Sequence, residues 1–294
     1  MVAVKQRSLP FIESKIAYGT AGQVKCKGVC IPASGSLLCG NIEGKDIWGK
    51  TVGRINTVFK RYEKKYILDG GQYRRFLEIA RQYMQVDEYG ESTVCNLYFD
   101  TTDFELIRNS IEKPVYKEKL RLRSYGVPKQ GDTVFLELKK KYKGVVYKRR
   151  IALSLEEAYQ SIQAGAVDGS RGQIGREINY FLEMYHPVPK VYLAYDRIAM
   201  YGKEDRELRM TFDFRIRSRE ENLDLAGGDG GELLLPEDNV IMEIKVKDAY
   251  PMWLIHALET VEIYPCSFSK YGNVYKSLIF PEWMEQIAAT EEIG

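Results

Sequence analysis

The sequence contains very little histidine, two residues among 294. His186 precedes a proline at the expected end of a helix, and His256 lies within an apolar helical pattern. Both settings are typical of structural histidines rather than of general bases or metal ligands. Chemistry that depends on histidine is therefore not expected, and an active site must use other side chains.

A long apolar run and a secretory signal are also lacking. No segment reaches the roughly 18 to 20 apolar residues of a bilayer-spanning helix, and the N-terminal MVAVKQRSLPFIESK has no continuous apolar core. The five cysteines form no tight pairing pattern, which suits a reducing compartment, and Cys26, Cys30 and Cys39 match no standard zinc spacing. We expect a cytoplasmic protein without direct membrane insertion, for which a membrane partner is left open.

An excess of charge of one sign is absent as well. The chain has 43 Lys and Arg against 41 Asp and Glu, a formal net charge of +2. The chain therefore lacks the overall positive charge that is typical of nucleic-acid-binding proteins. The expected strands also show no array of aromatics suited to base stacking. We expect no nucleic-acid partner, and an anion site must arise from sorting charges onto one surface.

What the sequence does contain is a repeated alternation of charged and apolar residues with a period of two. Successive side chains on a strand point to opposite faces, so each charged set lines one face of its strand. The sets are Arg61, Glu63 and Lys65; Arg121 and Arg123; Glu137 and Lys139; Lys148 and Arg150; Arg209, Thr211 and Asp213; and Glu243, Lys245 and Lys247. One such strand is an ordinary surface strand, whereas this repetition indicates a sheet whose charged face holds a polyanion.

Regular alternation of apolar and polar residues, typical of strands and helices, begins near residue 58. Residues 1–55 are rich in Gly, Ser and small side chains without a sustained period, so we expect a poorly ordered N-terminal extension there and a single domain over 56–290. Eight strands are expected, at 58–67, 92–100, 116–125, 133–142, 145–152, 190–201, 207–216 and 239–247.

Helices are expected between and after these strands. Asp69 is a plausible N-cap for a helix over 70–84, and Ser154 with Glu157 forms a capping box for a helix that ends near residue 164. Further helices are expected in 104–113, 175–185, after Pro251, and over the closing 270–290 segment. Lys140, Lys141 and Lys143 lie beside a hairpin turn and are expected to face solvent.

This pattern predicts an α+β fold with a largely antiparallel sheet and peripheral helices. Eight strands suffice to close a barrel. If the charged face points inward, the barrel is a tunnel lined with Arg and Lys. If it points outward, the interior is an ordinary apolar core, as in most small barrels. Periodicity alone leaves both orientations open.

Short motifs follow one another in order from about residue 58 to 280: RYEKKY, NLYFDT, LRLRSYG, FLELKKK, VYKRRI, YDRIAMYG, LRMTFD, MEIKVK and SFSKYG. Together they resemble the polyphosphate polymerase domain of the vacuolar transporter chaperone (VTC) complex, within the CYTH or triphosphate tunnel metalloenzyme superfamily. The superfamily's opening E-x-E-x-K is matched by Arg61, Glu63 and Lys65, and the arginine in the first acidic place resembles the VTC branch. Ser267 departs from the family, since it stands where a lysine is expected and only Lys270 remains.

The resemblance implies an eight-stranded closed tunnel in which the γ-phosphate of ATP is transferred to a growing inorganic polyphosphate chain. It implies a divalent metal, Mn²⁺ or Mg²⁺, with Glu243 as its ligand. Glu63, Glu137 and Asp213 either support that metal or pair with neighbouring cations. The residues implied to act on phosphate are Lys65, Arg121, Arg123, Lys139, Lys148, Arg150, Arg197, Arg209 and Lys270, of which Arg121, Arg123, Lys139 and Arg197 are expected to bind the nucleotide.

Two other functions remain open: a triphosphate or polyphosphate hydrolase of the same superfamily, and a polyphosphate-binding module without catalysis. Arginine forks match phosphate oxygens, and ionised phosphate ends need no strong base, which suits a site without histidine. Hydrolysis needs a water molecule activated by carboxylates and metal ions. The arginine at position 61, in an acidic place of the hydrolases, therefore argues modestly for the polymerase.

Overall fold

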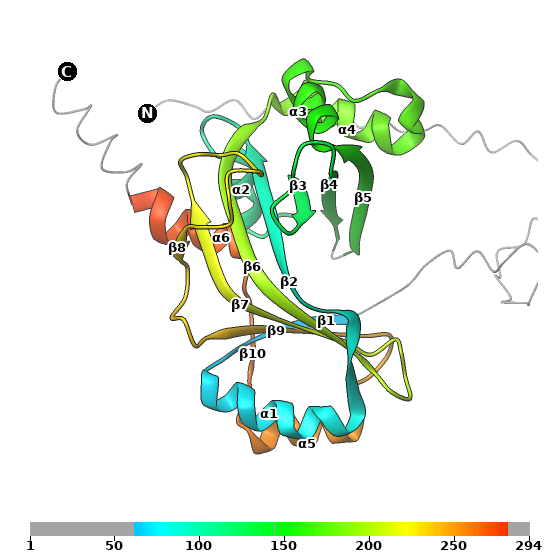
Figure 1. Cartoon of the computed structure of the whole chain (residues 1–294), viewed down its shortest axis with the longest axis vertical. Coiled ribbons are helices and arrows are strands. Elements are labelled where there is room, and N and C mark those ends of the chain that lie inside the picture. The colour runs from blue at the N-terminus through cyan, green and yellow to red at the C-terminus, as the bar shows by residue number, and fades with distance from the viewer. Residues whose placement is uncertain (1–61, 144, 282–294) are drawn as a thin grey trace, which may run out of the picture. The chain divides into compact units, whose positions relative to one another are not determined.

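The computed structural model describes residues 62–143 and 145–281 (Figure 1). The predicted extension over 1–55, Arg61, the start of the first expected strand and the three N-terminal cysteines lie outside the described residues. The extents of the extension and of the domain therefore stay predictions.

One antiparallel sheet contains all the described strands, in the order β10-β1-β9-β7-β6-β2-β3-β4-β5, with β8 paired to β7. The strands are β1 (Tyr62–Leu68), β2 (Met84–Asp100), β3 (Tyr116–Tyr125), β4 (Thr133–Tyr142), β5 (Val145–Ser154), β6 (Val188–Gly202), β7 (Arg209–Arg219), β8 (Glu232–Leu233), β9 (Val240–Val246) and β10 (Pro265–Cys266). The helices are α1 (Gly70–Tyr83), α2 (Glu105–Ile111), α3 (Leu155–Ala164), α4 (Gly172–Tyr185), α5 (Met252–Thr260) and α6 (Lys270–Val274), with the short helices η1 (Gly169–Arg171) and η2 (Tyr275–Ile279). The predicted α+β class and antiparallel sheet are confirmed.

The predicted N-cap at Asp69 and the predicted capping box at Ser154 are both present, and the Asp69 cap is a capping box as well. The backbone N–H of Gln72 donates to the Asp69 carboxylate at 2.7 Å, at the start of α1. The Glu157 N–H donates to the Ser154 hydroxyl at 3.2 Å, at the start of α3. Each cap satisfies a backbone donor that has no partner within its helix, so both helices begin where the sequence predicts.

β2 is longer than expected, because it begins at Met84 rather than at residue 92. Its first part pairs with β6, but the register shifts between Val86 and Glu91. Gly90, at φ 60°, lies within this irregular stretch. The bulge breaks the strict alternation on which the prediction depended, so the sequence pattern did not reveal this part of the strand.

Closure of the barrel by backbone hydrogen bonds is not found. Within the described ranges, no ladder joins β5 at one end of the sheet to β10 or β1 at the other. β10 has only two residues, and Pro265 lacks the N–H that a ladder requires. The expectation of a closed barrel is thus corrected to a curved sheet with two unjoined ends.

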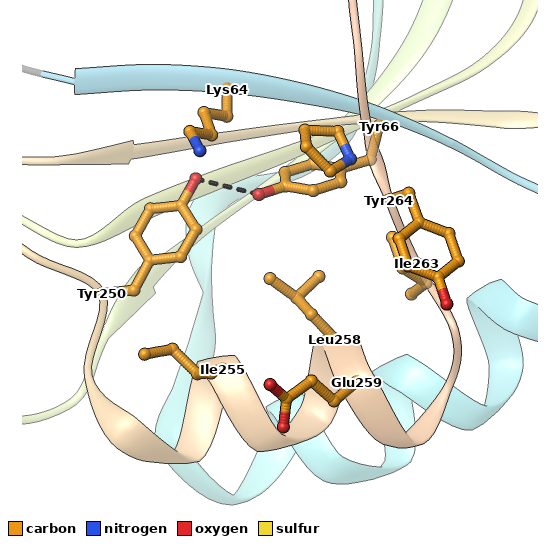
Figure 2. Close-up of a pocket in the computed structure, with 9 residues that line it drawn as sticks. Lys64, Tyr66, Tyr250, Ile255, Leu258, Glu259, Ile263 and Tyr264 are labelled. Carbon is orange, nitrogen blue, oxygen red and sulfur yellow. Dashed lines mark hydrogen bonds between the residues drawn. The ribbon is translucent and has the colours of Figure 1, made fainter.

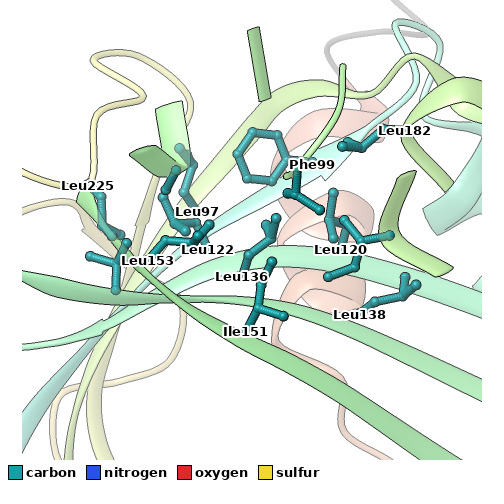
Figure 3. Packing of buried hydrophobic residues seen from close by; sticks show 14 of the residues in the cluster. Leu97, Phe99, Leu120, Leu122, Leu136, Leu138, Ile151, Leu153, Leu182 and Leu225 are labelled. Atoms are coloured by element: carbon teal, nitrogen blue, oxygen red, sulfur yellow. The ribbon is translucent and has the colours of Figure 1, made fainter. Parts of the chain in front are cut away.

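Helices α1, α3, α4 and α5 cover one face of the sheet, and the apolar residues of the alternating strands lie beneath them. Leu97, Leu122 and Leu136 belong to a fully buried cluster formed by β2, β3, β4 and β5 with α3 and α4 (Figure 3). A second cluster joins β1, β7 and β9 to α1 and α5, which lie side by side in Figure 1. We call the side covered by α1, α3, α4 and α5 the outer face.

The opposite, inner face carries the charged sets. A third apolar cluster covers part of it, where α2, α6 and η2 pack against Tyr98 of β2 and Tyr195 of β6. The ring of Tyr271 from α6 stacks on Tyr98 with 5.0 Å between ring centroids. The C-terminal segment therefore borders the charged residues and brings side chains of its own to them.

Candidate functional site

Glu137 on β4 is the centre of the first charged group on the inner face. Its side chain is 1% exposed, and Arg121 donates to one of its oxygens from Nε and Nη2 at 2.9 and 2.7 Å. Arg150 Nε and Lys148 Nζ lie 2.6 and 2.8 Å from its other oxygen. Burial alone would raise the pKa of Glu137, but Arg121, Arg123 and Lys148 hold it well below its usual range. One buried carboxylate thus fixes three cationic side chains from β3 and β5.

Arg123 and Arg121 are also held by neutral partners from the middle of the sheet. Arg123 Nε donates to Asn96 Oδ1 at 2.9 Å, and its Nη2 lies 3.1 Å from the Tyr195 hydroxyl. Arg121 Nη1 donates to the Tyr98 hydroxyl at 3.1 Å. These neutral hydrogen bonds orient the two guanidinium groups without neutralising them, and the single carboxylate of Glu137 is shared among all the cations around it. Planar forks fixed in this way suit bidentate contact with phosphate oxygens.

Asp213 on β7 is the centre of a second group. Arg197 on β6 donates from Nε and Nη2 to its two oxygens at 2.6 and 2.9 Å, and Lys270 of α6 contacts the same carboxylate. Asp213 is fully buried, which alone would raise its pKa; Lys270 and Arg197 instead hold that pKa below its usual range. The helix that follows β10 thus supplies a cation to a carboxylate in the centre of the sheet.

Glu243 on β9 is the centre of a third group. Lys65 Nζ on β1 and Lys245 Nζ lie 3.3 and 2.5 Å from its carboxylate, and Glu63 lies 3.5 Å from Lys65. Burial would raise the pKa of Glu243, but Lys65 and Lys245 lower it below its usual range. This end of the inner face therefore holds two neighbouring carboxylates, both ion-paired with lysines.

The inner face curves round on itself. Lys139 on β4 interacts electrostatically with Glu63 and Lys65 on β1 and with Glu243 on β9, although five strands separate β4 from β1 in the sheet. Although water reaches the Lys139 side chain, surrounding protein desolvates its ammonium group and lowers its pKa. The charged groups of the two ends of the sheet therefore face a common space.

The structure places every predicted site residue that it describes on this face. Arg209 lies at the margin of the group, exposed and in register with Lys245. Glu137 and Asp213, for which two roles remained open, pair with cations, and Glu63 does so beside Glu243. Sequence reasoning missed Asn96, Tyr98 and Tyr195, which orient the arginines, and it gave Lys245 no role beyond its place on the charged face. Asn96, Tyr98 and Tyr195 carry no charge that would mark them in the sequence.

One expectation outside the site is wrong. Lys140 does not simply face solvent, because its Nζ lies 3.5 and 3.2 Å from Glu118 and Glu177 on the outer face. Its side chain is 20% exposed. The sequence could not show this, since Glu177 comes from α4, far along the chain. Lys141 is exposed, as expected.

A separate pocket lies on the outer side of β1, against α5 and β10 (Figure 2). The hydroxyls of Tyr66 and Tyr250 lie 3.1 Å apart within it, and Leu258 and Tyr264 add apolar surface. Lys64 is its single cation, so this pocket does not have the lining that a phosphate chain requires. The inner face remains the candidate site.

The family sequence model of the VTC domain matches residues 60–279. The chain belongs to the VTC domain family. The match covers all the strands described above, so the inner face is that of a VTC domain. Among curated proteins, none matches the sequence. Within the described ranges, no helix is both long and apolar enough to cross a membrane.

Solved structures share the fold only distantly. A protein from Vibrio parahaemolyticus described as a candidate adenylate cyclase has a TM-score of 0.40 and 12% identity, over 74% of this chain and 97% of that one. A candidate adenylyl cyclase from Hippeastrum, described as having a dominant triphosphatase activity, has a TM-score of 0.45 and 14% identity, over 74% and 96% of the two chains. Similarity at this level says nothing about activity.

Proposed function

We propose that this VTC domain is an ATP-dependent polyphosphate polymerase. The observation that carries the proposal is the inner face, where three buried carboxylates hold more cationic side chains than they neutralise. Fixed cations in a desolvated space bind a polyanion far better than exposed ones do. Family membership supports a phosphate-related role for this array, and the roles of individual residues are part of the proposal.

Arg121, Arg123 and Arg197 would bind the triphosphate of ATP. Each guanidinium is already oriented by a neighbouring carboxylate, amide or phenol, so little side-chain freedom is lost when phosphate binds. Lys65, Lys148 and Lys270, with Arg150 and Arg209 at the margins, would neutralise the remaining phosphate oxygens. Positioning and electrostatic stabilisation are the main requirements of phosphoryl transfer.

In the proposed reaction, a terminal oxygen of the polyphosphate chain attacks the γ-phosphorus of ATP. A new P–O bond forms while the bond from the γ-phosphorus to the β,γ-bridging oxygen breaks, and ADP leaves with that electron pair. The attacking oxygen is ionised near neutral pH, so no proton has to be removed by a base. The cations of the inner face would stabilise the charge that develops on the transferred group.

The residues of the inner face would supply enough ligands for a divalent metal only together with the phosphates of a bound substrate. Among the described residues, no group of three or more His, Cys, Asp or Glu is placed to hold an ion. Mg²⁺ and Mn²⁺ are commonly bound by one or two carboxylates and by substrate phosphates. Glu243, with Glu63 beside it, would hold such an ion, which supplies charge neutralisation at phosphate oxygens when bound. The choice between the two metals and the cytoplasmic location stay predictions.

The proposal is tested by incubating the purified full chain with ATP and Mn²⁺ or Mg²⁺ and staining a gel for polyphosphate. We expect long chains to accumulate and ADP to be released in step with them. Release of inorganic phosphate from tripolyphosphate or ATP without chain growth would instead identify a hydrolase. Tight binding of polyphosphate without turnover, unaffected by Glu243→Gln, would identify a non-catalytic binding module.

A further inference from the structure

Two of the sequence motifs contain buried polar residues that the proposed function does not use. Asp100 of NLYFDT is the last residue of β2 and is 0% exposed, and Tyr271 of SFSKYG lies on α6 and is 3% exposed. The Tyr271 hydroxyl donates to Asp100 Oδ2 at 2.8 Å, although 171 positions separate the two residues in the chain. This hydrogen bond joins the end of a central strand to the helix that carries Lys270.

Asp100 accepts hydrogen bonds from two helices. Its Oδ1 accepts from the Leu106 N–H at 2.9 Å and its Oδ2 from the Ile107 N–H at 3.0 Å, both in α2, while Tyr271 donates from α6. Burial raises the pKa of Asp100, and these hydrogen bonds act in the opposite direction. Burial and the nearby charge of Asp100 raise the pKa of Tyr271, so this hydroxyl keeps its proton and remains the donor. One buried carboxylate thus ties α2 and α6 to the sheet.

The position of α6 depends on such contacts. The helix has five residues, and isolated helices shorter than about 12 residues are marginal in water. Lys119 donates to the hydroxyl of Ser269, the N-cap of α6, at 3.2 Å, and the Tyr271 ring stacks on Tyr98 with 5.0 Å between ring centroids. The bond from Tyr271 to Asp100 is buried, whereas that from Lys119 is exposed to water. Loss of the buried bond costs more, because water cannot readily replace the missing donor.

Lys270 changes the balance of charge at Asp213. Arg197 and Asp213 by themselves form a neutral pair. Lys270 contacts the same carboxylate, so the three side chains together carry one surplus positive charge. Lys270 is next to Tyr271 in α6, and a shift of this short helix would move its ammonium group away from Asp213. The positive charge offered to phosphate at this point therefore depends on how α6 is held.

We propose that Asp100 and Tyr271 are positioning residues, whose hydrogen bond holds α6 against the inner face and thereby places Lys270 at Asp213. Both act through Lys270 and not by contact with phosphate. The inference rests on the proposed function, since Lys270 is one of the cations assigned there to phosphate oxygens. It adds a second set of residues, outside the charged groups, on which phosphate binding depends.

The test is a double-mutant cycle on the full chain, read as the affinity for tripolyphosphate in the absence of ATP and measured by calorimetry. Tyr271→Phe removes the hydroxyl and keeps the ring that stacks on Tyr98; it is made in the wild-type protein and in Lys270→Gln. The matched control is Tyr275→Phe, because Tyr275 is also buried and its hydroxyl has no hydrogen-bond partner among the described residues. Thermal unfolding checks that every variant is folded at the temperature of the titration.

We expect Tyr271→Phe to weaken tripolyphosphate binding roughly fivefold, on the scale of one intramolecular hydrogen bond. Tyr275→Phe should leave the affinity unchanged. In the Lys270→Gln background, Tyr271→Phe should change the affinity by less than about twofold, because the charge through which Tyr271 acts is already absent. A purely structural role would lower the unfolding temperature without this dependence on Lys270.

Three results would each overturn the inference: unchanged affinity in Tyr271→Phe, the same loss with and without Lys270, or an equal loss in Tyr275→Phe. These results are separate from the polymerase assay. If ATP gives no chain growth but the loss of binding depends on Lys270, the polymerase proposal fails and the positioning role stands. If chains grow but binding does not depend on Tyr271, the polymerase stands and the positioning role is rejected.

Discussion

The two faces of the sheet use charge in different ways. On the outer face, charged residues form local pairs at the edges of apolar clusters, such as Lys140 with Glu118 and Glu177. On the inner face, a single carboxylate such as Glu137 is shared by several cations. The outer face is therefore arranged for stability, whereas the inner face keeps a surplus of positive charge that a ligand can neutralise.

The largest effect on stability is expected from Glu137→Gln. Removing the shared carboxylate leaves Arg121, Lys148 and Arg150 without their common partner, and breaking a buried ion pair typically costs about 3–5 kcal/mol. Urea unfolding should show this loss, and added tripolyphosphate should restore part of it. If the variant is as stable as the wild type, the inner cations do not depend on their carboxylate.

The outer face is tested by Leu122→Ala. Leu122 is fully buried in the cluster shown in Figure 3, so truncation should lower the free energy of unfolding by about 3 kcal/mol. Leu233→Ala, at an exposed position on β8, is the control and should change it by less than about 0.5 kcal/mol. Equal effects at the two positions would contradict the division between the faces.

Arg121→Ala should have the opposite effect to Leu122→Ala: little loss of stability and a large loss of substrate binding. Glu137 keeps Arg150 and Lys148 as partners, whereas a charged hydrogen bond to phosphate contributes about 2 kcal/mol, or roughly thirtyfold in affinity. Tripolyphosphate titration measures the effect. Arg149→Ala removes the same charge from the outer face of β5, where Arg149 pairs with Glu177, and should leave binding unchanged.

Acid should destabilise the protein through the inner face. The pKa values of Glu137, Asp213 and Glu243 are lowered in the folded state. The unfolded chain therefore binds more protons below its ordinary carboxyl pKa values of about 4, and stability falls as the pH drops through that range. Urea midpoints measured from neutral pH downward should show the fall, with a shallower slope in Glu137→Gln. A slope that is the same in that variant would assign the acid sensitivity to other carboxyls.

The smallest effect on stability is expected for Arg209→Ala, because Arg209 is exposed at the margin of the inner face. The free energy of unfolding should change by less than about 0.5 kcal/mol, as for most surface substitutions. A reduced rate of chain growth in the polymerase assay, at unchanged stability, would place Arg209 in the site. An unchanged rate would place it outside.

Much of this division could be predicted from the sequence. Alternation with a period of two placed Arg121, Lys139 and Glu243 on one face and their apolar neighbours on the other, because the geometry of a strand is local. The caps at Asp69 and Ser154 were predictable for the same reason. The orientation of the charged face was not, since it depends on where α1, α3, α4 and α5 pack against the sheet.

The partners of the site residues could not be predicted either. Arg197 meets Asp213 through pairing of β6 and β7, and Lys270 reaches the same carboxylate because α6 packs onto the inner face. These contacts join residues far apart in the chain, and no local pattern encodes them. The position of Lys119 beside Ser269 is of the same kind.

The unjoined ends of the sheet have a consequence for how a long ligand would enter or leave the inner face. A ring of backbone hydrogen bonds would oblige a bound chain to thread through end-first and would resist widening. In the described part of this protein, no backbone ladder joins β5 to β1 or β10. The product of the proposed polymerase would therefore not be enclosed by a ring of backbone hydrogen bonds.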